Sequence, residues 1–379
     1  MEKAKKITIL MLHLQHGGIE RQTILFANEL CKKYNVEIIS TYSMKKEPAY
    51  NVDNRIKIKY LIDDAPNRNE FKEAIKKINI FKIMKEGLKA FKILKLKKKL
   101  MEEQIKKLDS DYVLSTRIEY AEMLSKYAQS GVITITQEHL HDDSTKYISR
   151  VKKAFSNLDF LIVLGPGSYE NYSKWLIDNK KIKILEIPNI LDNIPDEKSK
   201  LNGFTLVSTG RMHPVKGFDD LLKVFKIVHD NISSARLNLI GDGDEYEKIK
   251  SMACKIGVSE YINMPGMVSI ENVKKYMLES DIYVMTSLTE CFPMVLLEAS
   301  SCGLPLIAFD VPVGPKAIIQ DGYNGYLIQE RDIEQMAKKI IELLKNRNKM
   351  DEMSKCAVDN ARQYLAENVM KKWYNIFDK

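Results

Sequence analysis

The sequence predicts an α/β protein of two domains, each built around a parallel β-sheet. Short runs rich in β-branched residues alternate with segments of helical periodicity, which is the pattern of parallel sheets covered on both faces. At roughly 150 residues per domain, the length of 379 residues suits two or three domains, and we expect two. A stretch with two prolines and several charges, residues 187–203, interrupts the alternation near the middle and is the expected linker.

The composition is typical of a globular protein from a reducing compartment. The hydrophobic share is 45% and the charged share is 29%, which excludes collagen-like and largely disordered chains. The five cysteines are odd in number and form no C-x-x-C pair, so we expect neither a disulfide framework nor a zinc site. No apolar stretch approaches the ~18 residues that span a bilayer, and the opening apolar run lacks a signal-peptide cleavage site. We therefore expect a cytoplasmic protein whose membrane contacts are made from the surface.

The first domain is expected to span residues 1–193. Alternating periodicity predicts strands at residues 7–14, 36–41, 113–115, 132–136, 160–164 and 182–187. It predicts helices at residues 19–33, 118–129, 145–156 and 166–178.

Positive charge is concentrated in one segment of this domain, residues 71–107. The segment holds 13 Lys against four Glu, a local charge of +9, whereas the whole chain carries +8. Apolar residues recur in it at steps of three and four, which predicts an amphipathic helix, or a helix pair that breaks at Gly87. One interpretation is an interfacial anchor on anionic lipid, and the other is a solvated helical hairpin on the core. No nucleic-acid-binding motif accompanies the lysines, so no nucleic-acid partner is expected.

The second domain is expected to span residues 194–360, with a final helix at 361–379. Strands are predicted at residues 205–209, 236–240, 282–286 and 304–308. Helices are predicted to start near residues 215, 245, 270 and 294, and to follow at 331–346 and 351–377. Trp373 and Tyr374 suggest that the end of the chain docks on another part of the protein.

Two turns have the composition of anion-binding loops. Gly17 and Gly18 follow the first strand and precede a helix, whose free N–H groups suit a phosphate, although a Gly-Gly turn is often only structural. The pattern is not G-x-G-x-x-G, so a dinucleotide fingerprint is absent. Arg211 and Lys216 follow the first strand of the second domain, where cations suit a pyrophosphate; the alternative is surface cations beside a helix start.

Carboxylates occur in two further loops. Asp242 and Asp244 form a D-x-D pattern that could hold a metal, but the triplet joins a strand to a helix and we interpret it as a turn, so no metal site is expected. Glu290 and Glu298 are separated by seven residues across a strand-to-helix turn, which allows both to face one ligand. Two carboxylates can also perform acid/base hydrolysis, but acids beside phosphate-binding amides favour hydroxyl binding.

Taken in order, these motifs resemble the retaining glycosyltransferases of family 4. The resemblance rests on Gly17-Gly18, the run from Gly210 to Lys216, Gly241-Asp242-Gly243, the E-x7-E pair and the segment PVGPKAIIQDGYNGYLI, and it spans both domains. It implies the GT-B fold, in which two Rossmann-like domains with parallel sheets face each other across a cleft. It also implies that the C-terminal domain holds a nucleotide sugar and that the C-terminal helix returns to the N-terminal domain, which would bind the acceptor.

The resemblance also implies a role for individual residues. Arg211 and Lys216 would bind the donor diphosphate and stabilise its developing charge, while Glu298 would bind the ribose and Glu290 a hydroxyl of the transferred sugar. His139 is similar to the histidine that lines the donor-sugar pocket, with His141 as a neighbouring alternative. With Glu290, Arg211 and Lys216, His139 forms the expected catalytic set. The other donor-binding residues would be Gly17, Gly18, Gly210, Val268, Phe292, Met294 and Val295.

The expected enzyme is a retaining hexosyltransferase that needs no cofactor or metal. It would move a hexose or N-acetylhexosamine from a nucleotide-diphosphate sugar, most commonly UDP in this family, to a hydroxyl of a lipid-linked saccharide. The process would be the biosynthesis of a surface polysaccharide, such as a capsule, or of another glycan. The location would be the inner face of the cell membrane, bound peripherally through residues 71–107.

Three alternatives remain open. The acceptor could be a protein or a teichoic acid, with the lysines binding a polyanion or protein instead of lipid. The chain could be a catalytically silent nucleotide-sugar-binding subunit, although intact Arg211, Lys216, Glu290 and Glu298 disfavour decay. A nucleotide-sugar 2-epimerase of the same fold would need carboxylates acting on the sugar ring, which E-x7-E does not indicate.

Overall fold

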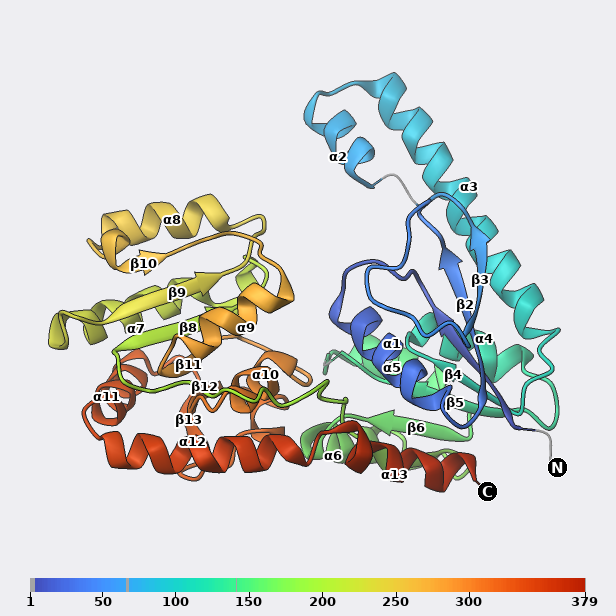
Figure 1. The fold of residues 1–379 in the computed structure, drawn as a ribbon. Helices are drawn as coiled ribbons and strands as arrows, with labels where there is room; N and C mark the ends of the chain where they lie inside the picture. Colours follow the sequence, from blue (N-terminus) through green and yellow to red (C-terminus); the bar gives the residue numbers. More distant parts are fainter. Residues whose placement is uncertain (1–3, 66–67, 141, 379) are drawn as a thin grey trace. The chain divides into compact units, whose positions relative to one another are not determined.

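The computed structural model describes residues 4–65, 68–140 and 142–378, which form two compact units (Figure 1). Unit 1 comprises Met1–Val163, Asn171–Ile187 and Lys372–Lys379. Unit 2 comprises Leu164–Glu170 and Pro188–Lys371. Each unit contains one parallel β-sheet with helices packed on it, so the predicted fold class is confirmed.

The sheet of unit 1 has seven parallel strands in the order β3-β2-β1-β4-β5-β6-β7. Their bounds are β1 Lys6–Met11, β2 Asn35–Tyr42, β3 Lys57–Ile62, β4 Tyr112–Ser115, β5 Ile133–Gln137, β6 Phe160–Val163 and β7 Lys183–Glu186. The order reverses between β1 and β4, so the loops that follow these two strands diverge and leave a crevice at their carboxyl ends. β3 was not predicted, because this half-exposed edge strand alternates lysine with apolar residues.

Six helices accompany this sheet along the chain. They are α1 Gly18–Leu30, α2 Arg68–Lys76, α3 Ile80–Ile105, α4 Ile118–Tyr127, α5 Thr145–Ala154 and α6 Pro166–Trp175. α6 begins among the residues grouped with unit 2 and ends among those grouped with unit 1.

The basic segment forms a helical hairpin, α2 and α3, but the predicted break at Gly87 is wrong. The turn lies at Ile78, whose φ is +51°, and at Asn79, whose side chain accepts a hydrogen bond from the Lys82 amide and caps α3. Gly87 lies inside α3, where an added Cβ would come 3.4 Å from the Phe71 ring. Gly87 therefore allows α2 to pack closely on α3 rather than ending the helix.

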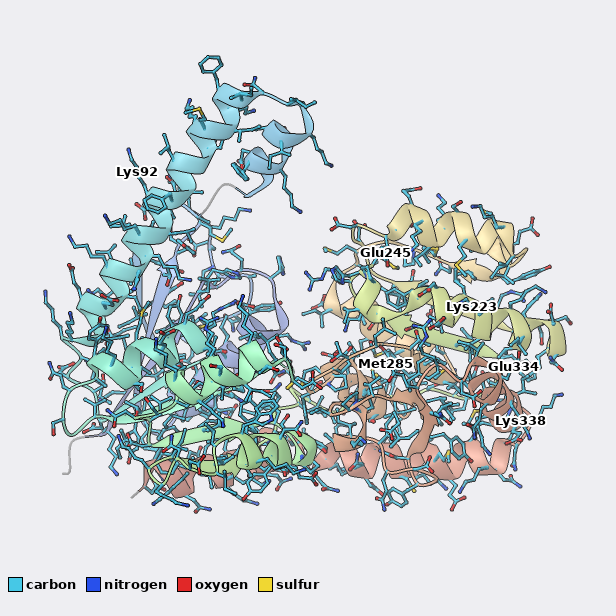
Figure 2. All side chains as sticks on the ribbon, turned by 180° about the vertical axis from the view of Figure 1, so that it is seen from behind. Lys92, Lys223, Glu245, Met285, Glu334 and Lys338 are labelled. Atoms are coloured by element: carbon cyan, nitrogen blue, oxygen red, sulfur yellow. The ribbon has the colours of Figure 1, made fainter. Side chains whose placement is uncertain are left out.

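The outer part of the hairpin carries its apolar side chains in solvent. Phe81 is 89% exposed and Phe91 66% exposed, and only three residues of α3 are buried, all from Ile93 onward. The α2 side of the hairpin and the outer end of α3 project from the sheet of unit 1 (Figure 1), and side chains such as Lys92 point away from it (Figure 2). The other exposed large apolar residues of the hairpin are Ile75, Ile78, Ile80, Met84, Leu88, Leu94 and Leu96.

The sheet of unit 2 has six parallel strands in the order β10-β9-β8-β11-β12-β13. Their bounds are β8 Thr205–Thr209, β9 Arg236–Ile240, β10 Ile262–Asn263, β11 Ile282–Met285, β12 Leu306–Asp310 and β13 Gly325–Gln329. The order reverses between β8 and β11, which creates the same kind of crevice as in unit 1.

Seven helices follow in the chain after β8. They are α7 Phe218–Asn231, α8 Tyr246–Lys255, α9 Ile270–Leu278, α10 Met294–Ser301, α11 Ile333–Leu344, α12 Arg347–Arg362 and α13 Ala366–Phe377. α7 starts later than predicted because Gly217 adopts a φ of +61° and ends a short 3-10 turn, Pro214–Lys216. The helix predicted at 351–377 is two helices, because the Tyr364 carbonyl leaves the helical pattern and accepts a hydrogen bond from the Leu191 amide at 2.7 Å.

The end of α13 completes the core of unit 1, as the terminal aromatic residues suggested. Trp373 is 1% exposed, and its ring centroid lies 4.4 Å from that of Phe26 on α1. Phe377 is fully buried, and its ring centroid lies 5.0 Å from that of Tyr112 on β4. Aromatic side chains of this size bury a large apolar area, so the helix end is a structural part of unit 1.

Replacing Trp373 by alanine should destabilise the protein by about 3–5 kcal/mol, because it leaves a large cavity against Phe26. Urea unfolding measures the change, and Asn375→Ala on the exposed side of the same helix is the matched control, with an expected effect below about 0.5 kcal/mol. Equal small effects for both variants would show that α13 is not docked on unit 1.

Candidate functional site

The crevice between β8 and β11 opens into a pocket of about 680 Å³ in unit 2. Open α/β sheets bind ligands at this position, where loops from neighbouring strands diverge. Five of the residues assigned to the donor from the sequence lie in its wall. The pocket is lined by Thr209, Gly210, Arg211, Ile240, Gly241, Asp242, Gly243, Met267, Val268, Val273, Val295 and Glu298.

Two glycine loops form one wall of the pocket. The Gly210 amide donates to the Ile240 carbonyl, and the Met212 amide donates to the Asp242 carbonyl at 2.8 Å, so the loops after β8 and β9 run edge to edge. A Cβ at Gly241 would lie 1.8 Å from the Gly210 carbonyl oxygen, and Gly241 has a φ of +139°. Only glycine suits such a close approach. The glycines therefore shape the wall by letting two backbones meet.

Asp242 makes a hydrogen bond inside this turn. Its Oδ1 accepts a hydrogen bond from the Gly243 amide at 2.7 Å, as in the turn that we predicted. Among the residues that the structure describes, no three His, Cys, Asp or Glu side chains are grouped as metal ligands.

Lys216 and Glu290 meet across the crevice. The Lys216 Nζ donates to Glu290 Oε1 at 2.5 Å, and the two side chains are 26% and 13% exposed. Their loops are joined by the backbone, because the Leu288 amide donates to the Val215 carbonyl at 2.8 Å. A Cβ at Gly314 would lie 2.6 Å from that of Glu290, so a third loop packs against the carboxylate's stem.

The start of α10 lies beside this pair in the chain. Pro293 is its N-cap and makes no side-chain capping bond, so the first amides of the helix, at Met294 and Val295, receive no cap from that residue. Val295 lines the pocket and Met294 is half-buried. Phe292 is buried, and its ring centroid lies 5.9 Å from that of Tyr364, so its side chain belongs to the core beneath the loop.

His139 follows β5 at the carboxyl edge of the unit 1 sheet. Its Nε2 is buried without a hydrogen-bond partner, and burial, with a smaller effect of the nearby Arg117 charge, lowers its pKa to about 4. The imidazole is therefore neutral at physiological pH, and its free nitrogen suits a ligand hydroxyl. His141 lies outside the described residues.

Glu138, beside His139, is a buried carboxyl that sequence reasoning missed. It is 4% exposed, and its Oε2 accepts hydrogen bonds from the Tyr147 hydroxyl at 2.5 Å and the Tyr172 hydroxyl at 3.1 Å. Burial raises its pKa to about 7 in spite of these donors. The neutral and charged forms of Glu138 are therefore both populated near physiological pH.

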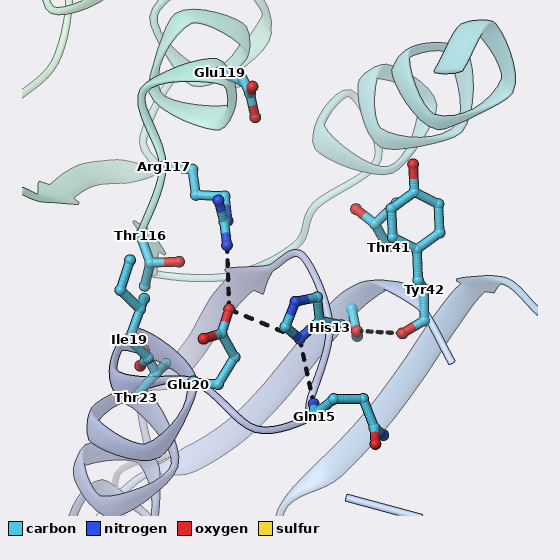
Figure 3. Close-up of polar contacts among 12 residues, drawn as sticks. His13, Gln15, Ile19, Glu20, Thr23, Thr41, Tyr42, Thr116, Arg117 and Glu119 are labelled. Atoms are coloured by element: carbon cyan, nitrogen blue, oxygen red, sulfur yellow. Dashed lines mark hydrogen bonds and ion pairs between the residues drawn. The ribbon is translucent and has the colours of Figure 1, made fainter. Parts of the chain in front are cut away.

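The crevice between β1 and β4 contains a second polar cluster (Figure 3). Glu20, only 5% exposed, accepts a hydrogen bond on Oε1 from Arg117 Nη2 at 3.1 Å. A Cβ at Gly17 would lie 2.0 Å from Glu20 Oε2, so the glycine makes room for this carboxylate. The Glu20 side chain therefore lies directly beside Gly17, and a role of Gly17 and Gly18 at the donor phosphates stays a prediction.

His13 completes this cluster in its neutral form. Its Nδ1 lies 3.8 Å from Glu20 Oε1, but it accepts a hydrogen bond from the Gln15 amide at 3.3 Å, so Nδ1 carries no proton. Burial also lowers the pKa of His13 more than Glu20 raises it. Because Arg117 is already neutralised by Glu20, the cluster suits a hydroxyl-rich ligand better than a second anion. The only feature of the sequence that could have indicated this cluster is the position of Glu20, directly after the Gly-Gly-Ile turn.

Replacing Glu138 by glutamine should change how stability depends on pH. The folded protein keeps the Glu138 proton up to about pH 7, whereas the unfolded chain loses it near pH 4.5, so the parent's free energy of unfolding falls as pH rises between these values. The glutamine of the variant has no proton to lose. The stability of the variant relative to the parent should therefore increase by up to roughly 3 kcal/mol between pH 4.5 and 7.5.

Urea unfolding of both proteins at pH 4.5, 6 and 7.5 measures this difference. His139 is present in both proteins, so its opposite pH dependence cancels in the comparison. A difference that stays constant with pH would contradict the raised pKa.

Residues 190–362 match the family model described as "Glycosyl transferases group 1". Two curated relatives align with 98% of this chain. One is an exopolysaccharide phosphotransferase of Streptomyces coelicolor, 24% identical, of whose length this chain spans 40%. The other is an uncharacterized glycosyltransferase of Haemophilus influenzae, 28% identical, of whose length it spans 99%.

A solved structure of similar fold is that of the G117R mutant of Staphylococcus aureus TarM, bound to fondaparinux, α-GlcNAc-glycerol and UDP. It superposes with a TM-score of 0.76 over 99% of this chain and 100% of the other, at 18% identity. TarM has the GT-B fold that the resemblance implied. The family match, the relatives and the shared architecture together support one conclusion: the protein is a glycosyltransferase of the GT-B fold.

Proposed function

We propose that this glycosyltransferase is a retaining enzyme of family 4 that moves a hexose or N-acetylhexosamine from a UDP-sugar to a hydroxyl of a lipid-linked saccharide. The product would be a bacterial surface polysaccharide, for example a capsule, or a related glycan. One observation carries the proposal: four charged residues from two chain segments lie at the strand-order reversal of unit 2. Arg211 and Lys216 follow β8, whereas Glu290 and Glu298 follow β11. Arg211 and Glu298 line the pocket, and Lys216 is paired with Glu290.

The donor site is proposed to use these groups according to their charge. Arg211 and Lys216 would bind the diphosphate, and the Met294 and Val295 amides at the start of α10 would add donors without a metal ion. Glu298 would accept hydrogen bonds from the ribose and Glu290 from the transferred sugar. The Val268 and Val295 side chains give the pocket an apolar surface suited to the flat face of a base.

The proposed chemistry needs no protein base at the reacting carbon. The bond between the anomeric carbon and the diphosphate oxygen breaks, and a new bond to the acceptor hydroxyl forms on the same face of the sugar. The acceptor proton passes to the departing diphosphate oxygen, whose negative charge Arg211 and Lys216 stabilise. His139, with its neutral ring and free Nε2, is proposed to contact the transferred sugar.

The α2–α3 hairpin is proposed to hold the enzyme at the inner face of the cell membrane. Its apolar residues face solvent beside many lysines, which is the arrangement of an interfacial anchor on anionic lipid. In the described residues, no helix is long and apolar enough to span a bilayer. Surface anchoring of this kind would bring the active site to a lipid-linked acceptor.

A polyanionic or protein acceptor is the second candidate. The lysines that would meet anionic headgroups could equally meet the phosphates of a teichoic acid. The exposed Phe81 and Phe91 favour lipid. A lipid surface would bury these apolar side chains, whereas a soluble polyanion would leave them in water.

A panel of nucleotide sugars tested with EDTA should identify one donor that binds and is slowly hydrolysed. Arg211→Ala and Glu298→Ala should each weaken its binding at least tenfold, because each removes a partner of the diphosphate or ribose. Isothermal titration measures binding and release of the nucleoside diphosphate measures turnover. Lys223→Ala, on α7 in the same unit, is the matched control and should bind as the parent does. If the parent binds none of the nucleotide sugars, both the proposed donor site and the alternative of a silent nucleotide-sugar-binding subunit are refuted.

Flotation with vesicles containing anionic lipid should recover the parent protein at low salt and lose it as salt rises. The triple variant Phe81→Ser, Leu88→Ser, Phe91→Ser should no longer float but should still hydrolyse the donor. Ile177→Gln with Ile270→Gln, two exposed apolar residues outside the hairpin, is the control and should float normally. Undiminished flotation of the triple variant would refute the anchor.

A further inference from the structure

The ion pair between Lys216 and Glu290 gives the donor site an internal counter-ion. Lys216 Nζ lies 2.5 Å from Glu290 Oε1, and both side chains are largely shielded from water. At such a position the pair is screened little by solvent or salt. Lys216, the cation that would bind the diphosphate, is therefore already paired with Glu290.

The backbones that carry the two side chains are hydrogen-bonded and closely packed, so we expect a change of partner to involve the side chains. The Thr286 hydroxyl donates to the Lys216 carbonyl at 3.3 Å, and a Cβ on Gly217 would lie 2.2 Å from the Thr286 carbonyl oxygen. The Lys216 stem lies over Gly210, within 3.6 Å of where a Cβ would be. A Cβ on Gly314 would lie 2.6 Å from the Cβ of Glu290. Lys216 could thus pass from Glu290 to a diphosphate by rotation of its side chain.

We infer that Glu290 competes with the diphosphate for Lys216, so that the site favours the nucleotide sugar over the free nucleoside diphosphate. The inference rests on the proposed function, because it assumes a donor diphosphate at Lys216. When a diphosphate takes the lysine, Glu290 loses its counter-ion beside a new negative charge. Such a carboxylate is destabilised unless new donors reach it.

The two nucleotides differ in whether they supply those donors. The sugar of a nucleotide sugar brings hydroxyl groups that can donate to Glu290, which compensates for the lost lysine. A nucleoside diphosphate without its sugar brings none. Once the sugar has been transferred, Glu290 therefore returns to Lys216 and displaces the diphosphate. The same carboxylate would help to hold the substrate and to release the product.

The test is the affinity of Glu290→Gln for UDP alone, with GDP and ADP measured alongside, by isothermal titration. The variant keeps the size of the side chain but removes the charge that competes for Lys216. We expect UDP, or whichever diphosphate the parent binds, to bind about tenfold more tightly, a ratio that corresponds to about 1.4 kcal/mol. The preference for the nucleotide sugar over the diphosphate should fall by at least the same factor.

Two controls separate this effect from a general change of charge. Glu298→Gln removes the other carboxylate of the proposed donor site and should weaken binding of the diphosphate, because its ribose contact is lost. In a Lys216→Gln background, Glu290→Gln should tighten diphosphate binding by a clearly smaller factor than in the parent, since only charge repulsion is relieved and there is no lysine to compete for.

Unchanged or weaker binding of the diphosphate by Glu290→Gln would overturn the competition, as would equal tightening in the Lys216→Gln background. Failure of the proposed function looks different: the parent and every variant would bind none of the three diphosphates.

Discussion

The reversal of strand order within each sheet is the constraint on which the chemistry of this protein depends. Strands of a parallel sheet buried on both faces have no room for charged side chains along their length, so polar groups gather where the strands end. The loops diverge only between β1 and β4 in unit 1, and between β8 and β11 in unit 2. The Glu20–Arg117 pair lies at the first of these points and the Lys216–Glu290 pair at the second. The reversal of strand order thus places a charged cluster in each unit.

Both clusters balance their charges internally. Glu20 neutralises Arg117, and Glu290 neutralises Lys216. Burial lowers the pKa values of His13 and His139, so both rings are neutral. A buried charge without a partner is strongly destabilising, so this pairing removes a cost of folding at both clusters. A ligand bound at either cluster would therefore bind by exchange, because its groups would replace contacts that already exist. Hydroxyl-rich ligands suit such exchange, since each hydroxyl both donates and accepts hydrogen bonds.

The sequence predicted elements that have a local periodicity, but it did not reveal interactions between residues far apart in the chain. β8 and β9 coincide with their predicted ranges, because a continuous apolar run between turns identifies a central strand. β10 has two residues and β13 starts at a glycine, so neither has a strand-like pattern. The loops that line the pocket of unit 2 could be singled out because their motifs are compact. The Glu20–Arg117 pair and the buried Glu138 depend on contacts between loops far apart in the chain, which no local pattern records.

The path of the chain has a consequence for biosynthesis. Unit 1 needs Trp373, Ile376 and Phe377 to close its core, and Lys33 bonds to Asp378, 345 positions further along. During translation the first unit therefore leaves the ribosome with an unfinished apolar surface, while all of unit 2 is synthesised before the missing helix end emerges. Since domains generally fold as units, unit 1 can complete its fold only after all of unit 2 has been synthesised. The half of the protein that is made first would be the last to be completed, and chaperones would have the longest access to it.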